Sequence, residues 1–309
     1  MNATISTPQA SAGIFNSRRL SLIDRQMLER WLVKENTESV QPGHASSVHV
    51  VRDNFGFLEK TPYSVLIISG LFNSPESMSG LVDHFSQQGM NIINMRLAGH
   101  YERDDTALAK TVEWQQWKEQ TDEAFDLAQR LGQKVILVGH STGALLLTWA
   151  AYERPEMVGG LALFSPAFVI TPASLFSAMV SKRLGINPIL DGRRITGHAG
   201  LQVQEMARHF RGLIHEGRSR SLIDNSDFSP LAEPLSQVPV WVANTALDVV
   251  IDVSAVDRFL HALRIEGSAP RLHYSVPACE WVLHDRIVLP NNGAWQPMLK
   301  SMTQILPKP

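Results

Sequence analysis

The stretch KVILVGHSTGALLLTWAAY, from Lys134 to Tyr152, decides the fold that this sequence predicts. An apolar run rich in β-branched residues comes directly before the motif GHSTG at 139–143, and a run of alanine and leucine that favours a helix follows it. A serine in the pattern G-x-S-x-G between a strand and a helix is typical of a nucleophile elbow. We therefore predict that Ser141 lies at a sharp strand-to-helix turn, with its hydroxyl raised above a β-sheet.

The two glycines and the threonine of the motif fit the requirements of such a turn. At such a strained turn, a Cβ atom at Gly139 or Gly143 would collide with the neighbouring strand or helix. The helix begins at Thr142, and N–H groups at the start of a helix can stabilise a negatively charged oxygen. A glycine-flanked serine in an ordinary turn is the alternative, and the flanking strand and helix favour the elbow.

The composition is that of an ordinary globular protein. Of the 309 residues, 44% are hydrophobic and 19% are charged, and the formal net charge is -2. This charge gives no general attraction to nucleic acid or to an anionic membrane, so we predict neither as a partner. The single cysteine, Cys279, excludes an intrachain disulfide framework and favours a reducing compartment. Without a signal-peptide core or a run long enough to span a membrane, we expect a cytoplasmic protein with no stable membrane insertion.

Apolar runs alternate with helix-forming segments on both sides of the elbow. Besides the run before the elbow, they predict strands at 46–51, 63–69, 90–96, 159–164, 239–244 and 271–276, and helices at 20–32, 74–89, 111–131, 254–263 and 295–306. Ser74 and Ser254 are the predicted N-caps of two of these helices. Residues 281–283 are expected to extend the last strand or to pair back onto it. The alternation indicates right-handed crossovers and a doubly wound, mostly parallel sheet, and so an α/β fold.

The alternation stops between Ala167 and Gln237, where the sequence shows helical pieces without clear strands. An insertion explains so many residues better than a structureless loop does. We therefore predict a helical cap at 169–235 on a core formed by 46–168 and 236–309. Residues 1–45 form an N-terminal extension with an amphipathic helix, which we expect to pack on the domain surface; docking to a membrane or a partner is the alternative.

A serine hydroxyl needs a base within hydrogen-bond reach, and the base needs an acceptor that fixes its tautomer. After an elbow, the acid comes before the histidine along the chain. Asp248 and His284 have this order, and each follows a predicted strand at the edge where α/β sheets collect their active sites. Asp252 and Asp257 are alternatives for the acid. His273 is the alternative histidine, but it falls inside a predicted strand.

The segment just after the first buried strand, at 63–69, is expected to take part in the active site. A second oxyanion donor is expected from the backbone just after that strand, and the N–H of Leu71 is our candidate beside that of Thr142. The other histidines lack the spacing of a metal site, and the sequence has no phosphate-binding glycine motif, so we predict no metal and no cofactor.

Four segments together resemble the α/β-hydrolase superfamily, and more narrowly its bacterial carboxylesterase and monoacylglycerol-lipase or lysophospholipase-like branch. They are SGLFNSPESM at 69–78, RLAGH at 96–100, GHSTG at 139–143 and FSPA at 164–167. The resemblance implies the α/β-hydrolase fold, catalytic residues Ser141, Asp248 and His284, and a cap that shapes an acyl pocket. The chain departs from the branch at Ser69, where a histidine is usual. A shorter loop after the last strand would place Glu280 at the position of the base.

These observations predict a serine hydrolase that cleaves the carboxylic ester of a small acyl substrate through an acyl-enzyme. The acyl pocket is expected to be apolar and lined in part by Phe72, Phe168 and Phe176, although packing in the core explains such residues equally well. Acyl transfer to another nucleophile uses the same three side chains. A non-catalytic binding protein with a hydrolase fold is the alternative from another class, indicated by Ser69, Glu280 and the amphipathic helix.

Overall fold

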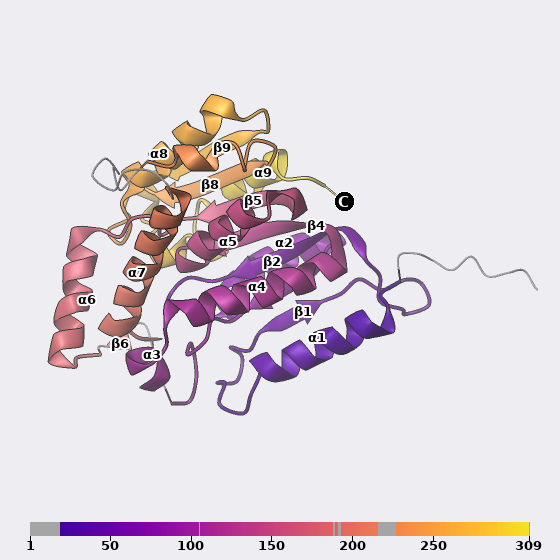
Figure 1. Ribbon diagram of the computed structural model, residues 1–309, viewed down its shortest axis with the longest axis horizontal. Coiled ribbons are helices and arrows are strands. Elements are labelled where there is room, and N and C mark those ends of the chain that lie inside the picture. The colour runs from indigo at the N-terminus through magenta and orange to yellow at the C-terminus, as the bar shows by residue number, and fades with distance from the viewer. Residues whose placement is uncertain (1–18, 105, 188, 191–192, 216–226, 309) are drawn as a thin grey trace, which may run out of the picture.

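The computed structural model describes residues 19–104, 106–187, 189–190, 193–215 and 227–308 (Figure 1). Within these ranges the chain folds around a seven-stranded sheet with the strand order β1-β3-β2-β4-β5-β8-β9. The β1–β3 pair is antiparallel and the other neighbouring pairs are parallel, which confirms the predicted sheet. The strands are β1 (Ser47–His49), β2 (Thr61–Ile68), β3 (Asn91–Met95), β4 (Gly132–His140), β5 (Val158–Phe164), β8 (Val240–Thr245) and β9 (Arg271–Val276).

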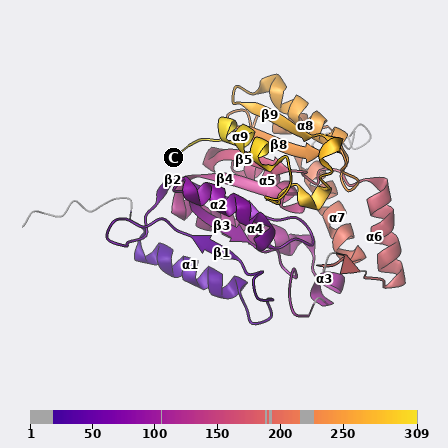
Figure 2. The same ribbon diagram turned by 180° about the vertical axis from the view of Figure 1, so that it is seen from behind.

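Both faces of the sheet are covered by helices, as Figures 1 and 2 show from opposite sides. Successive side chains of a strand point to opposite faces, so a strand buried on both faces is apolar throughout. In β2, Leu66 and Ile68 pack into one hydrophobic cluster while Val65 and Ile67 pack into the other. The first cluster includes residues of α4 (Trp114–Leu131), α5 (Thr142–Glu153) and α8 (Val253–Glu266), and the second includes residues of α2 (Ser79–Gln87) and α9 (Trp295–Ile305).

The strand order changes direction beside the elbow. After β2 the chain forms β3 on one side of it, and then crosses to form β4 on the other side. Such a reversal opens a crevice at the carboxyl ends of the two strands on which the connections diverge. The segment from Ser69 to Asn73 leaves β2 at this edge, and Ser141 leaves β4 beside it.

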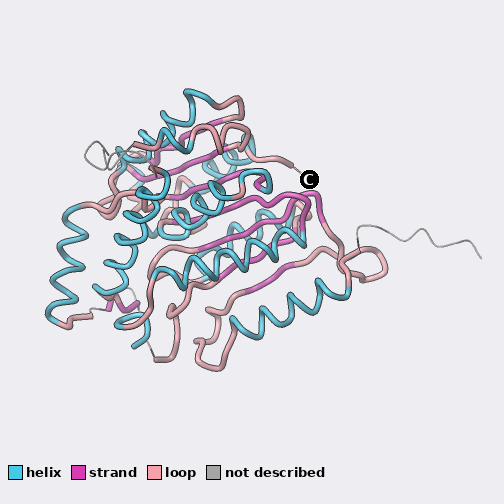
Figure 3. Tube along the Cα trace, viewed as in Figure 1, coloured by secondary structure: helices cyan, strands magenta, loops and turns pink. Residues whose placement is uncertain are grey.

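Beyond β5 the chain forms two helices that pack against each other, α6 (Pro172–Leu184) and α7 (Gly197–Ile214). Between them along the chain, β6 (Ile189–Leu190) and β7 (Arg193–Arg194) form a short antiparallel pair. In Figure 3 α6 lies at the outer edge, and α7 lies between α6 and the ends of the strands. The division into core and cap stays a prediction, and residues 216–226 of the proposed cap lie outside the described residues.

The helix expected in the N-terminal extension is α1 (Leu22–Glu35), which lies beside β1 and α4 (Figure 1). Leu28 and Trp31 are buried in the first cluster, so the helix packs on the domain as predicted, but Ile23 and Met27 of the expected apolar face are exposed. Residues 1–18 of the extension lie outside the described ranges. Among the described helices, α1 included, none has the length and apolar character needed to cross a membrane.

Ser74 is the predicted N-cap with Pro75 after it, but the turn that it opens is a 3-10 turn at Pro75–Met78 and its side chain makes no capping bond. Two other local predictions are wrong. The N-cap of α8 is Asp252 rather than Ser254, and its carboxylate accepts from the N–H of Ser254. Residues 281–283 do not form a strand, because Trp281 has a left-handed backbone (φ 51°) between 3-10 turns at Ala278–Glu280 and His284–Arg286.

Candidate active site

Ser141 occupies the turn between β4 and α5 with φ 50° and ψ -112°, a backbone conformation that L residues rarely adopt. Neighbouring strands and loops hold it there. Its N–H donates to the carbonyl of Phe164 at 2.9 Å, and its carbonyl accepts from the N–H of Ala167 at 3.1 Å. The strained turn that the motif predicts is therefore present and is fixed by the backbone of β5 and the loop after it.

The two glycines of the motif are required by their surroundings. A Cβ atom at Gly139 would lie 2.5 Å from the Cα of Ala144, and one at Gly143 would lie 2.3 Å from the carbonyl oxygen of Ile68. Both obstacles are backbone atoms, which cannot turn aside as a flexible side chain can. The predicted steric role of Gly139 and Gly143 is confirmed.

The structure brings the side chains of Ser141, Asp248 and His284 together. The Nδ1 atom of His284 lies 2.7 Å from Oδ2 of Asp248, and its Nε2 atom lies 2.8 Å from Oγ of Ser141. An ionised carboxylate can only accept, so Nδ1 carries the hydrogen and Nε2 is free to accept the serine hydroxyl proton. This is the arrangement that a general base for a serine nucleophile requires.

Asp248 lies in the loop after β8, with its side chain fully buried. Burial alone would raise the pKa of this carboxyl. The hydrogen bond and charge of His284, together with N–H groups of Ile251 and Val250 at 3.1 and 3.0 Å from Oδ1, outweigh burial and hold the pKa of Asp248 below its ordinary value. Asp248 is thus an ionised, immobile acceptor for the imidazole.

His140, inside the motif, has a role that the sequence did not reveal. Its imidazole is buried, and its Nε2 lies 2.9 Å from the backbone carbonyl of His284. Since a carbonyl accepts only, Nε2 carries the hydrogen, and Nδ1 accepts from the side-chain amide of Asn73 at 3.3 Å. Burial, and then the nearby His284, lower the pKa of His140 to about 3, so it stays neutral. Only the position of a histidine next to the serine could have hinted at this contact.

The alternative acids and bases lie elsewhere. Asp252 caps α8, and Asp257 lies on that helix with its carboxylate 3.3 Å from the imidazole of His273 on β9. Glu280 is exposed, and its carboxylate lies next to Gly293. None of the four shares a hydrogen bond with Ser141 in the described structure, whereas His284 does.

The two proposed oxyanion donors flank the serine. Thr142 is the first residue of α5 and follows Ser141 directly. Leu71 follows Gly70, whose backbone passes so close to the elbow that a Cβ atom there would lie 2.9 Å from Cβ of Ser141. The structure thus places the backbone of both residues near the serine, and their role as donors stays a prediction.

The three phenylalanines proposed for the acyl pocket have different surroundings. Phe72 is half-buried in the loop after β2. Phe168 is fully buried, with its ring 4.7 Å from that of Phe259 and 5.2 Å from that of Phe228. Phe176 projects from α6 with 69% of its surface exposed. Contact of these rings with an acyl chain stays a prediction.

Comparison with known proteins places the chain among hydrolases. The model of the family described as serine aminopeptidase S33 matches residues 60–269, a segment that contains Ser141 and Asp248 and ends before His284. A thermostable monoacylglycerol lipase from Bacillus sp. (strain H-257) is 24% identical over 103 residues, which are 33% of this chain and 40% of that protein. The matched region therefore spans less than half of that relative.

Solved structures resemble the chain over most of its length. One structure comes from work on the metagenome-derived lipolytic enzymes LipS and LipT and has a TM-score of 0.63 and 17% identity. The match covers 86% of this chain and 98% of the chain in that structure. A soluble variant of monoglyceride lipase from Saccharomyces cerevisiae has a TM-score of 0.60 and 13% identity. The match covers 84% of this chain and 90% of that protein's chain. At such identities the likeness shows the fold alone, which is the α/β-hydrolase fold.

Proposed function

The chain belongs to the family described as serine aminopeptidase S33, and from this premise we propose that it is a serine hydrolase of the lipase and esterase type that cleaves carboxylic esters. The observation that carries the proposal is the unbroken pair of hydrogen bonds from Asp248 through His284 to Ser141. The partial similarity to a monoacylglycerol lipase supports an ester as the substrate.

In the first half of the reaction, Oγ of Ser141 attacks the carbonyl carbon of the ester while Nε2 of His284 takes its proton. The buried carboxylate of Asp248 keeps the imidazole in the correct tautomer and stabilises the imidazolium that forms. The carbonyl oxygen becomes an anion, which the N–H groups of Leu71 and Thr142 would stabilise. When the tetrahedral intermediate collapses, the alcohol leaves with the proton from His284 and the acyl group stays on Ser141.

In the second half, a water molecule takes the place of the alcohol. His284 accepts a proton from the water as its oxygen attacks the acyl-enzyme, and then returns that proton to Oγ of Ser141 as the carboxylic acid leaves. The net reaction is ester plus water to acid plus alcohol. If an alcohol or amine attacks instead of water, the same three residues carry out acyl transfer, so the acceptor alone separates the two reactions.

The proposal is tested by turnover of p-nitrophenyl esters of graded acyl length, in the wild type and in three variants. His284→Ala should reduce kcat by about four orders of magnitude, because no other group can take the serine proton. His273→Ala and Glu280→Ala change the two alternative bases and should leave kcat within about twofold of the wild type. Loss of activity in Glu280→Ala with activity kept in His284→Ala would move the base to Glu280.

The same assay separates the remaining functions. Added alcohols that divert the acyl group from water would identify an acyltransferase. Amino-acid anilides test the peptidase activity that the family description names. A chain that turns over none of these substrates would be a binding protein with a hydrolase fold.

A further inference from the structure

We infer that Tyr101 is a positioning residue for the loop that carries Leu71, and that residues 35–46 of the N-terminal extension hold Tyr101 in place. We call residues 69–73 the oxyanion loop. The inference rests on the proposed function, because it concerns how the N–H of Leu71 is kept beside Ser141. It assigns a part in catalysis to a segment that precedes the family-matched residues 60–269.

The oxyanion loop has a conformation that requires support. Phe72 has φ 62°, in the left-handed region that residues with a side chain rarely adopt. Within the loop, the N–H of Asn73 donates to the carbonyl of Gly70 at 3.1 Å. From outside the loop, the hydroxyl of Tyr101 donates to the carbonyl of Phe72 at 3.0 Å, from 29 residues further along the chain. Tyr101 thus binds the residue directly after the proposed donor.

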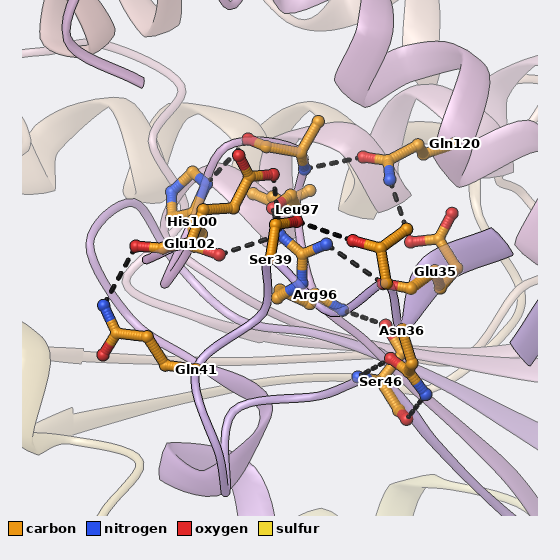
Figure 4. A network of polar contacts seen from close by, with 12 residues as sticks. Glu35, Asn36, Ser39, Gln41, Ser46, Arg96, Leu97, His100, Glu102 and Gln120 are labelled. Carbon is orange, nitrogen blue, oxygen red and sulfur yellow. Dashed lines mark hydrogen bonds and ion pairs between the residues drawn. The ribbon is translucent and has the colours of Figure 1, made fainter. Parts of the chain in front are cut away.

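Tyr101 is itself held by the N-terminal extension. It also has a left-handed backbone, with φ 52°. Its carbonyl accepts from the N–H of Gln41 at 2.8 Å, and its ring stacks on that of His44, with the centroids 4.1 Å apart and the planes 22° from parallel. Val40 and Glu102 form an antiparallel bridge, and the side chain of Gln41 donates to the carbonyl of Glu102 at 3.0 Å (Figure 4). The extension therefore fixes both the backbone and the ring of Tyr101.

A buried polar network fixes the extension to the loop after β3. The guanidinium of Arg96 donates to the carbonyl of His100 at 2.8 Å and to that of Glu35 at 3.1 Å. The side chain of Gln120 donates to the carboxylate of Glu35 at 2.9 Å and accepts from the N–H of Ala98 at 2.7 Å. Figure 4 shows these bonds meeting around Arg96, between the end of α1 and the loop. Arg96 and Glu35 are almost fully buried, and the guanidinium of Arg96 also forms an ion pair with the carboxylate of Glu102 at 3.5 Å.

These contacts form a continuous connection from α1 to the oxyanion loop. A displacement of a catalytic group by about 1 Å can cost about 100-fold in rate, so small shifts of the Leu71 N–H have measurable effects. The connection supports the transition state, in which the oxygen is charged, more than the bound ester. Weakening it should therefore lower kcat and leave KM nearly unchanged.

The first test is Tyr101→Phe, which removes the hydroxyl and keeps the ring that stacks on His44. We expect kcat for p-nitrophenyl butyrate to fall about tenfold or more, with KM within about twofold of the wild type. The Ki of an alkyl trifluoromethyl ketone, whose bound oxygen takes the place of the oxyanion, should rise by the same factor as kcat/KM falls. The matched control is Tyr152→Phe on α5, whose ring packs against Phe210; kcat and Ki should stay unchanged.

The second test concerns the extension. His44→Ala removes the ring that stacks on Tyr101 and should give the same pattern, lower kcat and higher Ki at constant KM, by a smaller factor. His49→Ala is the matched control, because His49 is exposed at the end of β1 and should change none of these quantities. Thermal unfolding of the four variants shows whether each remains folded at the assay temperature.

The outcomes separate this inference from the proposed function. An active wild type whose kcat and Ki are unchanged by Tyr101→Phe would overturn the role of Tyr101. A change in Tyr101→Phe with none in a folded His44→Ala would overturn the role of the stacking contact. A wild type that neither hydrolyses esters nor binds the ketone would instead overturn the proposed function, and this inference with it.

Discussion

The imidazole of His140 donates a hydrogen bond to the backbone carbonyl of His284 across 2.9 Å, so the residue before the serine holds the backbone of the residue that would take the serine proton. The two rings lie with their centroids 5.1 Å apart. His284 is thus held twice, by Asp248 through its side chain and by His140 through its main chain. The elbow motif thus contains the proposed nucleophile and also one residue that supports the proposed base.

The first prediction concerns this support. His140→Ala should reduce kcat about 10- to 100-fold, because the segment that carries His284 loses a buried hydrogen bond and its imidazole is less well placed. His140→Gln keeps an amide N–H that can reach the same carbonyl and should recover part of the loss. Steady-state kinetics on an activated ester measure both. Equal activities in the alanine and glutamine variants would argue against a positioning role.

The second prediction separates two neighbouring aspartates. Asp248→Asn should reduce kcat about 10⁴-fold, since the amide no longer favours the tautomer in which Nε2 accepts. Asp252→Asn should keep full activity, and also stability, because asparagine caps a helix about as well as aspartate does. Turnover and urea unfolding of both variants check this pair. Activity lost in Asp252→Asn and kept in Asp248→Asn would exchange their assigned roles.

The third prediction concerns stability at low pH. Burial lowers the pKa of His100 to about 4, from an ordinary 6.5 in the unfolded chain. The unfolded state therefore takes up a proton between these values that the folded state does not. The stability that neutral His100 provides is fully present above about pH 6.5 and is lost as the pH falls toward about 4.

His140 acts in the same direction over a window that reaches about pH 3. The free energy of unfolding should thus fall steeply below pH 6.5. In His100→Gln, the slope between pH 6 and 5 should be smaller by one proton, roughly 1.4 kcal/mol per pH unit. Urea unfolding at pH 7, 6 and 5 gives this slope independently of the variant's absolute stability. An unchanged slope would mean that His100 is protonated in the folded protein.

The fourth prediction compares two glycines. Gly143→Ala should prevent stable folding or abolish activity, because the new methyl group would lie 2.3 Å from the carbonyl oxygen of Ile68. Gly212, inside α7, has open space around the position of a Cβ atom. Gly212→Ala should raise stability by up to about 1 kcal/mol, as alanine does in a helix interior. Thermal unfolding of both variants measures the contrast, and a folded, active Gly143→Ala would contradict the steric account.

The order of strands, the elbow and the positions of the helices could be predicted because they depend on local patterns. The apolar runs of β2 and β4 are fixed by burial on both faces, and Gly139 and Gly143 mark the turn by themselves. Asp248 and His284 could be proposed as well, because a chain order and a position after a strand are properties of the sequence.

Other features depend on contacts between distant residues and were not predictable. Trp281 takes a left-handed conformation that no local pattern demands, so the segment before His284 was predicted as a strand. Asp252 caps α8 although Ser254 and Asp257 also fit a capping pattern, because the helix begins two residues earlier. The bond from Tyr101 to Phe72 joins two loops whose proximity follows only from the assembled sheet.

The central claim is that Ser141 is a nucleophile activated by His284, and labelling with a fluorophosphonate tests it most directly. The intact mass of the wild type should increase by one phosphonyl group, and peptide mapping should place that group on Ser141. Ser141→Ala should not be labelled, and His284→Ala should react slower by orders of magnitude. A folded wild type that stays unlabelled, or one labelled at a different residue, would contradict the account.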